Sequence, residues 1–137
     1  MTEPTGPSPH LTWTELSCHD EIRTPYPLDW RASRAPSLAR AFERVRAAAG
    51  GHPLKVLSAY RTPEWNKLIG GAEHSQHCQG RALDLAAPDT MSVRTFYSLI
   101  IALAPDTDIR YVEGYPEQGF VHLDVRPSAV LKQKWNG

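Results

Sequence analysis

The sequence of 137 residues has no excess of either charge and no long apolar run. Its 15 Lys and Arg residues balance its 15 Asp and Glu residues, which argues against broad electrostatic binding to nucleic acid or to an anionic membrane. The longest apolar stretch, Leu99 to Ala104, is far shorter than the roughly 20 residues that cross a bilayer. We therefore expect no nucleic-acid partner and no membrane-spanning segment.

Cysteine is also scarce, with only Cys18 and Cys78 in the chain. A single pair favours two reduced thiols over a disulfide, and it excludes a closed zinc site made of cysteines. The first ten residues hold three prolines and no apolar segment of the kind found in a signal peptide. We expect a flexible N-terminal tail over 1–10, a single domain over 11–137, and a monomer.

Apolar spacing along the chain indicates short helices and strands. Helices are predicted over 36–49, 62–69 and 92–103, and strands over 54–60, 81–86, 109–113 and 119–126. Residues 11–35 and 72–80 have the composition of loops. The last two strands are too close for a crossover, so the order predicts an α+β fold with a small antiparallel sheet flanked by helices.

Two of these segments place a histidine or a carboxylate opposite an apolar face. His122 and Asp124 alternate with core residues in one strand, as Asp84 does in another. Gly80 permits a sharp turn through which His77 can fold back towards Asp84. If the two strands are neighbours, the two imidazoles and Asp84 form the ligand set of a catalytic zinc. By spacing alone, ordinary surface or buried histidines remain the alternative, and no HExxH helix is present.

Two segments of the chain resemble the paired signature of the M15 zinc D-Ala-D-Ala peptidases: 75–84 (SQHCQGRALD) and 120–124 (FVHLD). Residues 11–20 (LTWTELSCHD) and 58–66 (SAYRTPEWN) are similar to further segments of that family, so the likeness covers roughly residues 11–135. The resemblance implies the fold shared by these peptidases and the signalling domain of hedgehog proteins. The resemblance also favours one branch of the M15 family, the branch designated A.

The resemblance also implies a chemistry. One Zn²⁺ ion would be bound by His77, Asp84 and His122 and would activate a water. The substrates would be bacterial peptidoglycan stem peptides or cross-links that contain D-amino acids. Arg61 would bind substrate or stabilise the oxyanion, and the substrate-contacting residues would include Ser75 and His74. Endopeptidase and carboxypeptidase activities both fit the motifs.

The general base is where the sequence departs from the best-known members. They carry an acid three residues before the last histidine ligand, or a histidine two before it, where this chain has Gly119 and Phe120. Asp124 is either an orienting partner of that ligand or the base, and Glu113 and Glu117 are the other candidates. The alternative function is an inactive, zinc-stabilised wall-binding or structural module. The lack of a leader is compatible with a phage lysin or a virion-associated enzyme, and the location is otherwise unknown.

Overall fold

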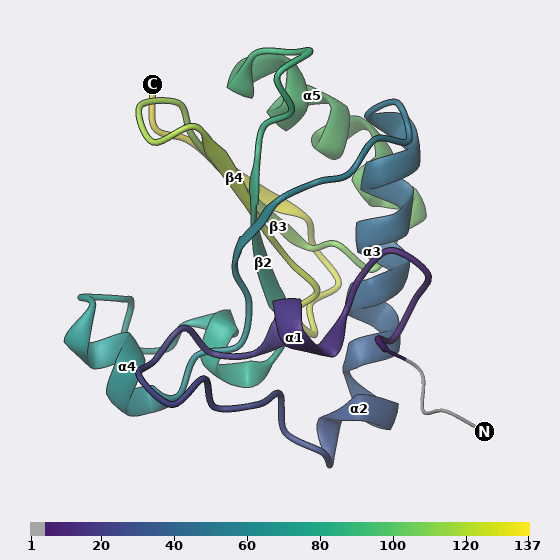
Figure 1. Cartoon of the computed structure of the whole chain (residues 1–137). Helices are drawn as coiled ribbons and strands as arrows, with labels where there is room; N and C mark the ends of the chain where they lie inside the picture. The colour runs from purple at the N-terminus through teal and green to yellow at the C-terminus, as the bar shows by residue number, and fades with distance from the viewer. Residues whose placement is uncertain (1–4) are drawn as a thin grey trace.

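The computed structural model describes residues 5–137 and contains one five-stranded sheet (Figure 1). The strands are β1 (Val56–Ser58), β2 (Ala82–Ala86), β3 (Tyr111–Tyr115), β4 (Phe120–Asp124) and β5 (Lys132–Trp135). The α-helices are α1 (Trp13–Leu16), α2 (Trp30–Ser33), α3 (Ala35–Ala48), α4 (Pro63–Leu68) and α5 (Val93–Leu103). Two 3₁₀ helices are η1 (Gln76–Gln79) and η2 (Ala104–Asp106). The predicted α+β class is confirmed.

The strand order in the sheet is β1-β2-β4-β3-β5, and only the pair β3–β5 is parallel. The central strand β4 pairs with both β2 and β3, so side chains from these three strands lie next to one another on each face of the sheet. In this register His122 of β4 has Asp84 as its direct partner in β2 and Glu113 as its direct partner in β3. The pairing of the two strands that carry the predicted ligands is therefore the one the metal hypothesis requires.

One face of the sheet packs against the two long helices, α3 and α5 (Figure 1). Both helices bury an apolar stripe, and the sheet contributes the side chains that alternate away from the polar face. The fully buried side chains of this layer include Leu38, Phe42, Phe96, Ile100, Leu83, Leu85, Val121 and Leu123. The opposite face carries the polar residues, beside η1 and α4.

The structure confirms the three predicted helices and the four predicted strands. Strands β1, β2 and β4 are shorter than expected, and β3 lies two residues further along the chain than the predicted strand over 109–113. It differs in the segment 11–35, where α1 and α2 interrupt the predicted loop, and in 72–80, where η1 forms. Strand β5 has no predicted counterpart, because its polar, mostly exposed side chains lack the alternation of a half-buried strand. Cys18 and Cys78 are free thiols, in agreement with expectation.

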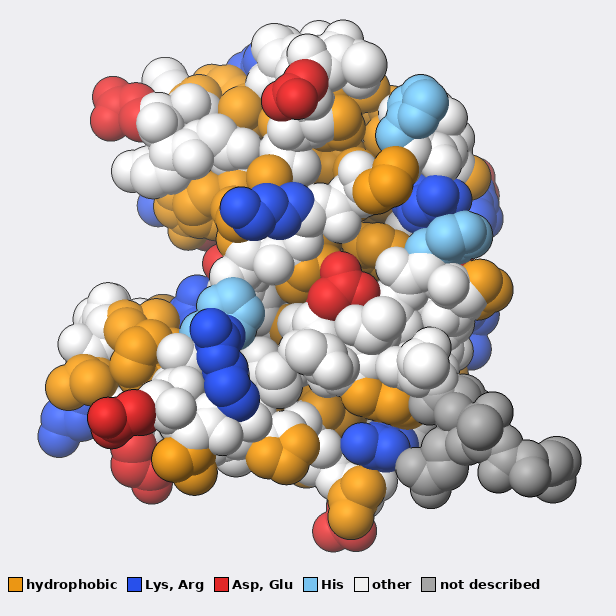
Figure 2. Space-filling view, viewed as in Figure 1, with side chains coloured by type: hydrophobic (Ala, Val, Ile, Leu, Met, Phe, Trp, Pro, Cys, Tyr) orange, Lys and Arg blue, Asp and Glu red, His pale blue; other side chains and the backbone are white. Residues whose placement is uncertain are grey.

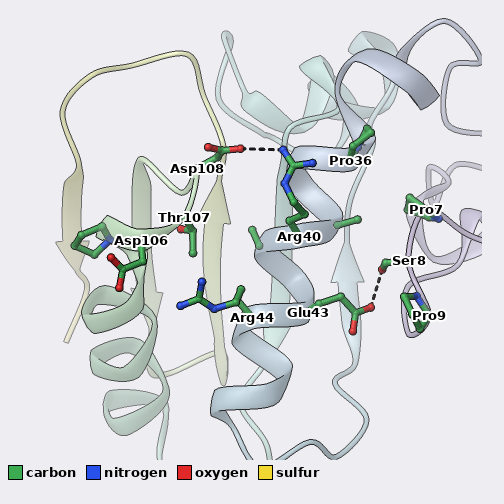
Figure 3. Close-up of a pocket in the computed structure, with 13 residues that line it drawn as sticks. Pro7, Ser8, Pro9, Pro36, Arg40, Glu43, Arg44, Asp106, Thr107 and Asp108 are labelled. Carbon is green, nitrogen blue, oxygen red and sulfur yellow. Dashed lines mark hydrogen bonds and ion pairs between the residues drawn. The ribbon is translucent and has the colours of Figure 1, made fainter.

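The N-terminal segment is attached to α3. Of the predicted tail over 1–10, residues 1–4 lie outside the described part of the chain, whereas residues 5–10 make specific contacts. The Ser8 hydroxyl donates to Glu43 at 2.7 Å, and the His10 backbone donates to the same carboxylate at 2.9 Å. Residues 7–9 also line a cavity of about 810 Å³, together with parts of α3 and residues 105–108, and none of the predicted site residues lies in it. Figure 3 shows these lining residues. No helix in residues 5–137 has the length and apolar character that spanning a membrane requires.

Candidate metal centre

The pairing of β2 and β4 brings Asp84 and His122 into contact. They are direct partners across the two strands, and both side chains point to the polar face of the sheet. The Nδ1 atom of His122 lies 3.0 Å from Oδ1 of Asp84. Two of the three predicted ligands are thus brought together by strand register alone.

The third predicted ligand, His77, reaches the same point from η1. The Ser75 hydroxyl caps this short helix by accepting from the His77 backbone at 3.1 Å, and Gly80 ends it with a positive φ of 67°. A Cβ at Gly80 would lie 2.7 Å from the Trp30 ring, so glycine is required for space as well as for conformation. The turn leaves Nε2 of His77 3.1 Å from Oδ1 of Asp84.

The hydrogen bonds of the two rings determine which nitrogens are left for a metal. Nδ1 of His77 lies 2.6 Å from the carbonyl oxygen of Ala59, and Nε2 of His122 lies 2.8 Å from Oδ2 of Asp124. A neutral imidazole that donates its single N–H to either acceptor turns the lone pair of its other nitrogen towards Asp84. Lone pairs of His77, His122 and Asp84 then converge, and a cation is the group that satisfies all three.

The distances within this cluster fit one ion. One ligand atom from each of His77, Asp84 and His122 lies within 4.8 Å of the other two. His77 and Asp84 are buried, and His122 is nearly so, which favours a fixed site over a loose surface one. Two imidazoles and one carboxylate are a common ligand set of catalytic zinc, and each histidine has the second hydrogen bond that orients such ligands. The residues present therefore fit a zinc ion.

The charges of the cluster are strongly coupled. Burial by itself raises the pKa of Asp84, but its hydrogen bond with His122 and its contact with the His77 ring outweigh burial and hold that pKa below its ordinary range. Burial lowers the pKa of His122, whereas its hydrogen bonds to Asp124 and Asp84 raise it to about 9. Burial lowers the pKa of His77. Without a cation, the cluster is expected to hold its proton on His122.

This proton makes the stability of the metal-free protein depend on pH. The pKa of His122 rises from 6.5 to about 9 on folding, so its contribution is complete below pH 6.5 and is lost as the pH rises through 9. A rise of this size corresponds to a loss of about 3 kcal/mol, at 1.36 kcal/mol for each pKa unit. Thermal unfolding of the metal-free protein should therefore shift to lower temperature between pH 6.5 and 9. The zinc-loaded protein should not show this shift, because no proton is bound at Nδ1; equal shifts in both forms would contradict the assignment.

Asp124 is fully buried and its oxygens are occupied. Oδ2 accepts from His122, and the two oxygens together accept from Nε and Nη2 of Arg126, both at 2.7 Å. Burial raises the pKa of Asp124, but the hydrogen bonds from Arg126 and His122 hold it below its usual value. A carboxylate in this position can fix the orientation of the His122 ring. Asp124 is fully buried and does not line the cavity, so it is poorly placed to accept a proton from a water there.

We therefore predict that Asp124→Asn weakens zinc binding without removing the ligands. Loss of an orienting carboxylate typically reduces metal affinity by about 10- to 100-fold. Competition with a chromophoric chelator measures this change, and Asp89→Asn, which alters an exposed aspartate, is the matched control. An Asp124→Asn protein with the zinc affinity of the wild type would show that Asp124 does not orient His122.

Arg61 lies beside the cluster and is largely buried, with 15% of its side chain exposed. Its nitrogens donate to Ser58 at 3.1 Å, to Asn66 at 3.2 Å and to Oδ2 of Asp84 at 3.4 Å. The guanidinium is thus held in one orientation next to the predicted ligands. This is a suitable place for a group that stabilises negative charge developing on a substrate oxygen.

The cluster lies in the wall of a cavity of about 910 Å³. Figure 2 shows the molecule hollowed at its left edge, between the part that carries α4 and the part that carries the turn from β3 to β4. The predicted site residues that line the cavity are Arg61, His74, Ser75, His77, Asp84, Glu113 and His122. Glu117 is exposed in the turn and is not part of this lining.

Glu113 occupies the position across from His122 on the same face of the sheet. Its carboxylate accepts from the Tyr111 hydroxyl at 2.6 Å and from the Asn136 amide at 2.9 Å. Burial raises its pKa, but these hydrogen bonds outweigh burial and keep the pKa below its ordinary value. Glu113 is therefore ionised at neutral pH and faces the cavity.

Several residues in or beside the cavity were not expected from the sequence, and four of them contact predicted site residues or lie beside them. Tyr111, Tyr115 and Arg126 line the cavity, and Asn136 holds Glu113. The two tyrosines alternate with core residues around Glu113, so the strand pattern contained a signal for them. Asn136 reaches the site only through the parallel pairing of β3 with β5, for which the sequence has no pattern.

Comparison with known proteins agrees with this geometry. A family model described as Peptidase M15 matches residues 9–124, which include all three clustered residues, Arg61 and Glu113. A search for similar curated proteins found no match. The matched range covers most of the chain and ends at the last residue of β4. The chain therefore belongs to the peptidase M15 family.

Proposed function

We propose that the protein is a zinc-dependent peptidase that hydrolyses bonds in bacterial peptidoglycan stem peptides or cross-links. The observation that carries this proposal is the convergence of His77, Asp84 and His122 in the wall of a cavity that also presents Arg61 and Glu113. A zinc ion held by three such ligands supplies a Lewis acid and a bound water whose pKa is about 7. The residues of the chain supply the remaining functions.

Glu113 is our choice for the general base. Its carboxylate is ionised and lines the cavity, and its strand position is opposite a metal ligand. Asp124 is fully buried and bound to His122 and Arg126, which fits an orienting role. Glu117 is exposed outside the cavity. These positions favour Glu113 for accepting the proton of the attacking water.

Arg61 and the loop before η1 are proposed to handle the substrate. The guanidinium of Arg61 would stabilise the negative charge that develops on the scissile carbonyl oxygen, because it is fixed beside Asp84. His74 and Ser75 lie in the cavity wall, where their side chains would contact the peptide. The specificity for D-amino acids, the place in branch A of the family and the phage-type role rest on the resemblance of the motifs at 75–84 and 120–124.

Digestion of purified peptidoglycan tests this function. The zinc-loaded protein should release fragments, and mass spectrometry of those fragments identifies the bond that is cut. The chelated protein should release none, and activity should return when zinc is restored. An inactive wall-binding module, which the glycine at position 119 keeps as the second candidate, would bind peptidoglycan with zinc present but release nothing.

A further inference from the structure

We propose that Arg126 forms a carboxylate-binding subsite in the same cavity, so that the preferred substrates carry a free carboxylate near the scissile bond. This inference rests on the proposed peptidase function and adds the substrate feature that the site selects. It is carried by the anchoring of the Arg126 side chain, by its unused donors and by its place relative to the metal cluster.

The guanidinium of Arg126 is held on two sides. Nε and Nη2 both donate to the fully buried Asp124 at 2.7 Å. The guanidinium also lies over the ring of Tyr111, with its carbon 4.3 Å from the ring centre. A side chain fixed in this way loses little further conformational entropy when it binds a ligand.

Arg126 still has donors that face solvent. Within the described residues Nη1 has no hydrogen-bond acceptor, and 35% of the side chain is exposed. By contrast, Nε, Nη1 and Nη2 of Arg61 each donate to a protein atom, and only 15% of that side chain is exposed. Of the two arginines that line the cavity, Arg126 thus has the nitrogen without a protein acceptor among residues 5–137 and the larger exposed fraction, and it is the better placed to bind a substrate carboxylate.

The Arg126 guanidinium lies near two carboxylates, Asp124 and Glu113, and keeps donors beyond its pair with Asp124. Asp124 accepts hydrogen bonds from two side chains, Arg126 and His122, so its negative charge is divided between them. Guanidinium groups bind carboxylates through charge-assisted hydrogen bonds, which are stronger than neutral ones. A substrate carboxylate is therefore a suitable second partner for Arg126.

The side chains that line the cavity also change in character along β4. Along β4 the side chains of Phe120, His122 and Asp124 follow one another on the same face, and Arg126 comes next. Phe120 stacks on Tyr115, with ring centres 4.6 Å apart and planes at 18°. The metal cluster therefore lies between an aromatic pair and a cation. A peptide crossing it would place apolar groups at Phe120 and its carboxylate at Arg126.

Two kinds of carboxylate have this chemistry in a stem peptide: the C-terminal carboxylate and the free α-carboxylate of an internal D-glutamyl residue. Two substrate pairs distinguish them. The first pair ends in D-Ala-D-Ala as the acid or the amide. The second pair has an amidated C-terminus and differs only in whether the internal carboxylate is free or amidated.

The variants are Arg126→Met, Arg126→Lys and Arg81→Met. Arg81→Met removes the same charge from a residue that does not line the cavity, and it is the matched control. We expect the wild type to prefer the acid of one pair by about 10- to 100-fold in kcat/KM, the range for hydrogen bonds to charged groups. Arg126→Met should reduce that preference to less than about twofold, whereas Arg126→Lys should keep part of it. Arg81→Met should keep all of it.

An Arg126 that only positions Asp124 would give a different result. Its loss would weaken zinc binding and slow cleavage of acid and amide alike, leaving their ratio unchanged. That outcome would overturn the subsite, as would a wild type with no preference in either pair. Zinc affinity measured on the same variants separates the two effects.

A direct binding measurement keeps the subsite separate from the peptidase activity. N-acetyl-D-alanine and its amide, and the D-glutamate derivatives that differ only at the α-carboxylate, are titrated into the zinc-loaded protein by calorimetry. Binding of one acid that is lost in Arg126→Met, with no cleavage of any peptide, would support the subsite and refute the proposed function. Cleavage without acid preference, together with no binding of either acid, would support the proposed function and refute the subsite.

Discussion

Replacing His122 by alanine should remove the bound zinc and reduce peptide hydrolysis to the level of the chelated protein. The Nδ1 atom of this ring is one of three ligand atoms that lie within 4.8 Å of each other, and two ligands do not hold a catalytic zinc firmly. The variant should also unfold at a lower temperature when zinc is present, because metal binding contributes to folding free energy. Elemental analysis of the dialysed protein measures the zinc content, and His77→Ala should behave in the same way.

The matched control for this experiment is His74→Ala. His74 lies in the same cavity wall but outside the cluster, so the variant should keep one zinc ion per chain. Zinc retained at the wild-type level in both His77→Ala and His122→Ala would contradict the ligand assignment. Zinc lost from His74→Ala as well would mean that the loop before η1, rather than the three side chains, determines metal binding.

The second large effect is expected for Glu113→Gln. The amide keeps the size of the side chain but does not accept a proton from water, so kcat should fall by about 10²- to 10⁴-fold, the usual contribution of a general base. Zinc content should remain that of the wild type, because Glu113 is not in the cluster. Steady-state hydrolysis of a stem-peptide substrate measures the change.

Glu117→Gln is the control for Glu113→Gln, because it changes an exposed glutamate in the turn next to β3. Its kcat should stay close to that of the wild type. A large fall in Glu117→Gln with little change in Glu113→Gln would reverse the assignment of the base. A large fall in both would indicate that the turn moves over the cavity during the reaction.

The parts of the fold that follow from local pattern could be predicted from the sequence. Helix α3, with Pro36 in its first turn, and the alternating strand β4 were expected close to where they occur. Helix α1 was missed although Thr12 and Glu15 form a capping box, a pattern that the sequence itself displays. Strand β5 could not be found in this way, because backbone pairing with β3 rather than side-chain periodicity makes it a strand.

The site shows the same division. The convergence of Asp84 and His122 followed from alternation once the two strands were neighbours, and the structure shows that they are. The sequence left the general base open among Asp124, Glu113 and Glu117, because a choice among them depends on burial, on hydrogen-bond partners and on which side chains line the cavity. The different roles proposed for Arg61 and Arg126 likewise depend on which of their nitrogens donate hydrogen bonds to protein atoms. Such distinctions are tertiary and have no signature at the level of residue spacing.

The most direct test of the metal centre is a crystal structure of the zinc-loaded protein with anomalous diffraction measured on both sides of the zinc absorption edge. We predict a single strong zinc peak about 2.0–2.2 Å from Nε2 of His77, a carboxylate oxygen of Asp84 and Nδ1 of His122, with a water as the fourth ligand. A zinc peak elsewhere, or one bound by the other nitrogen of either histidine, would contradict it.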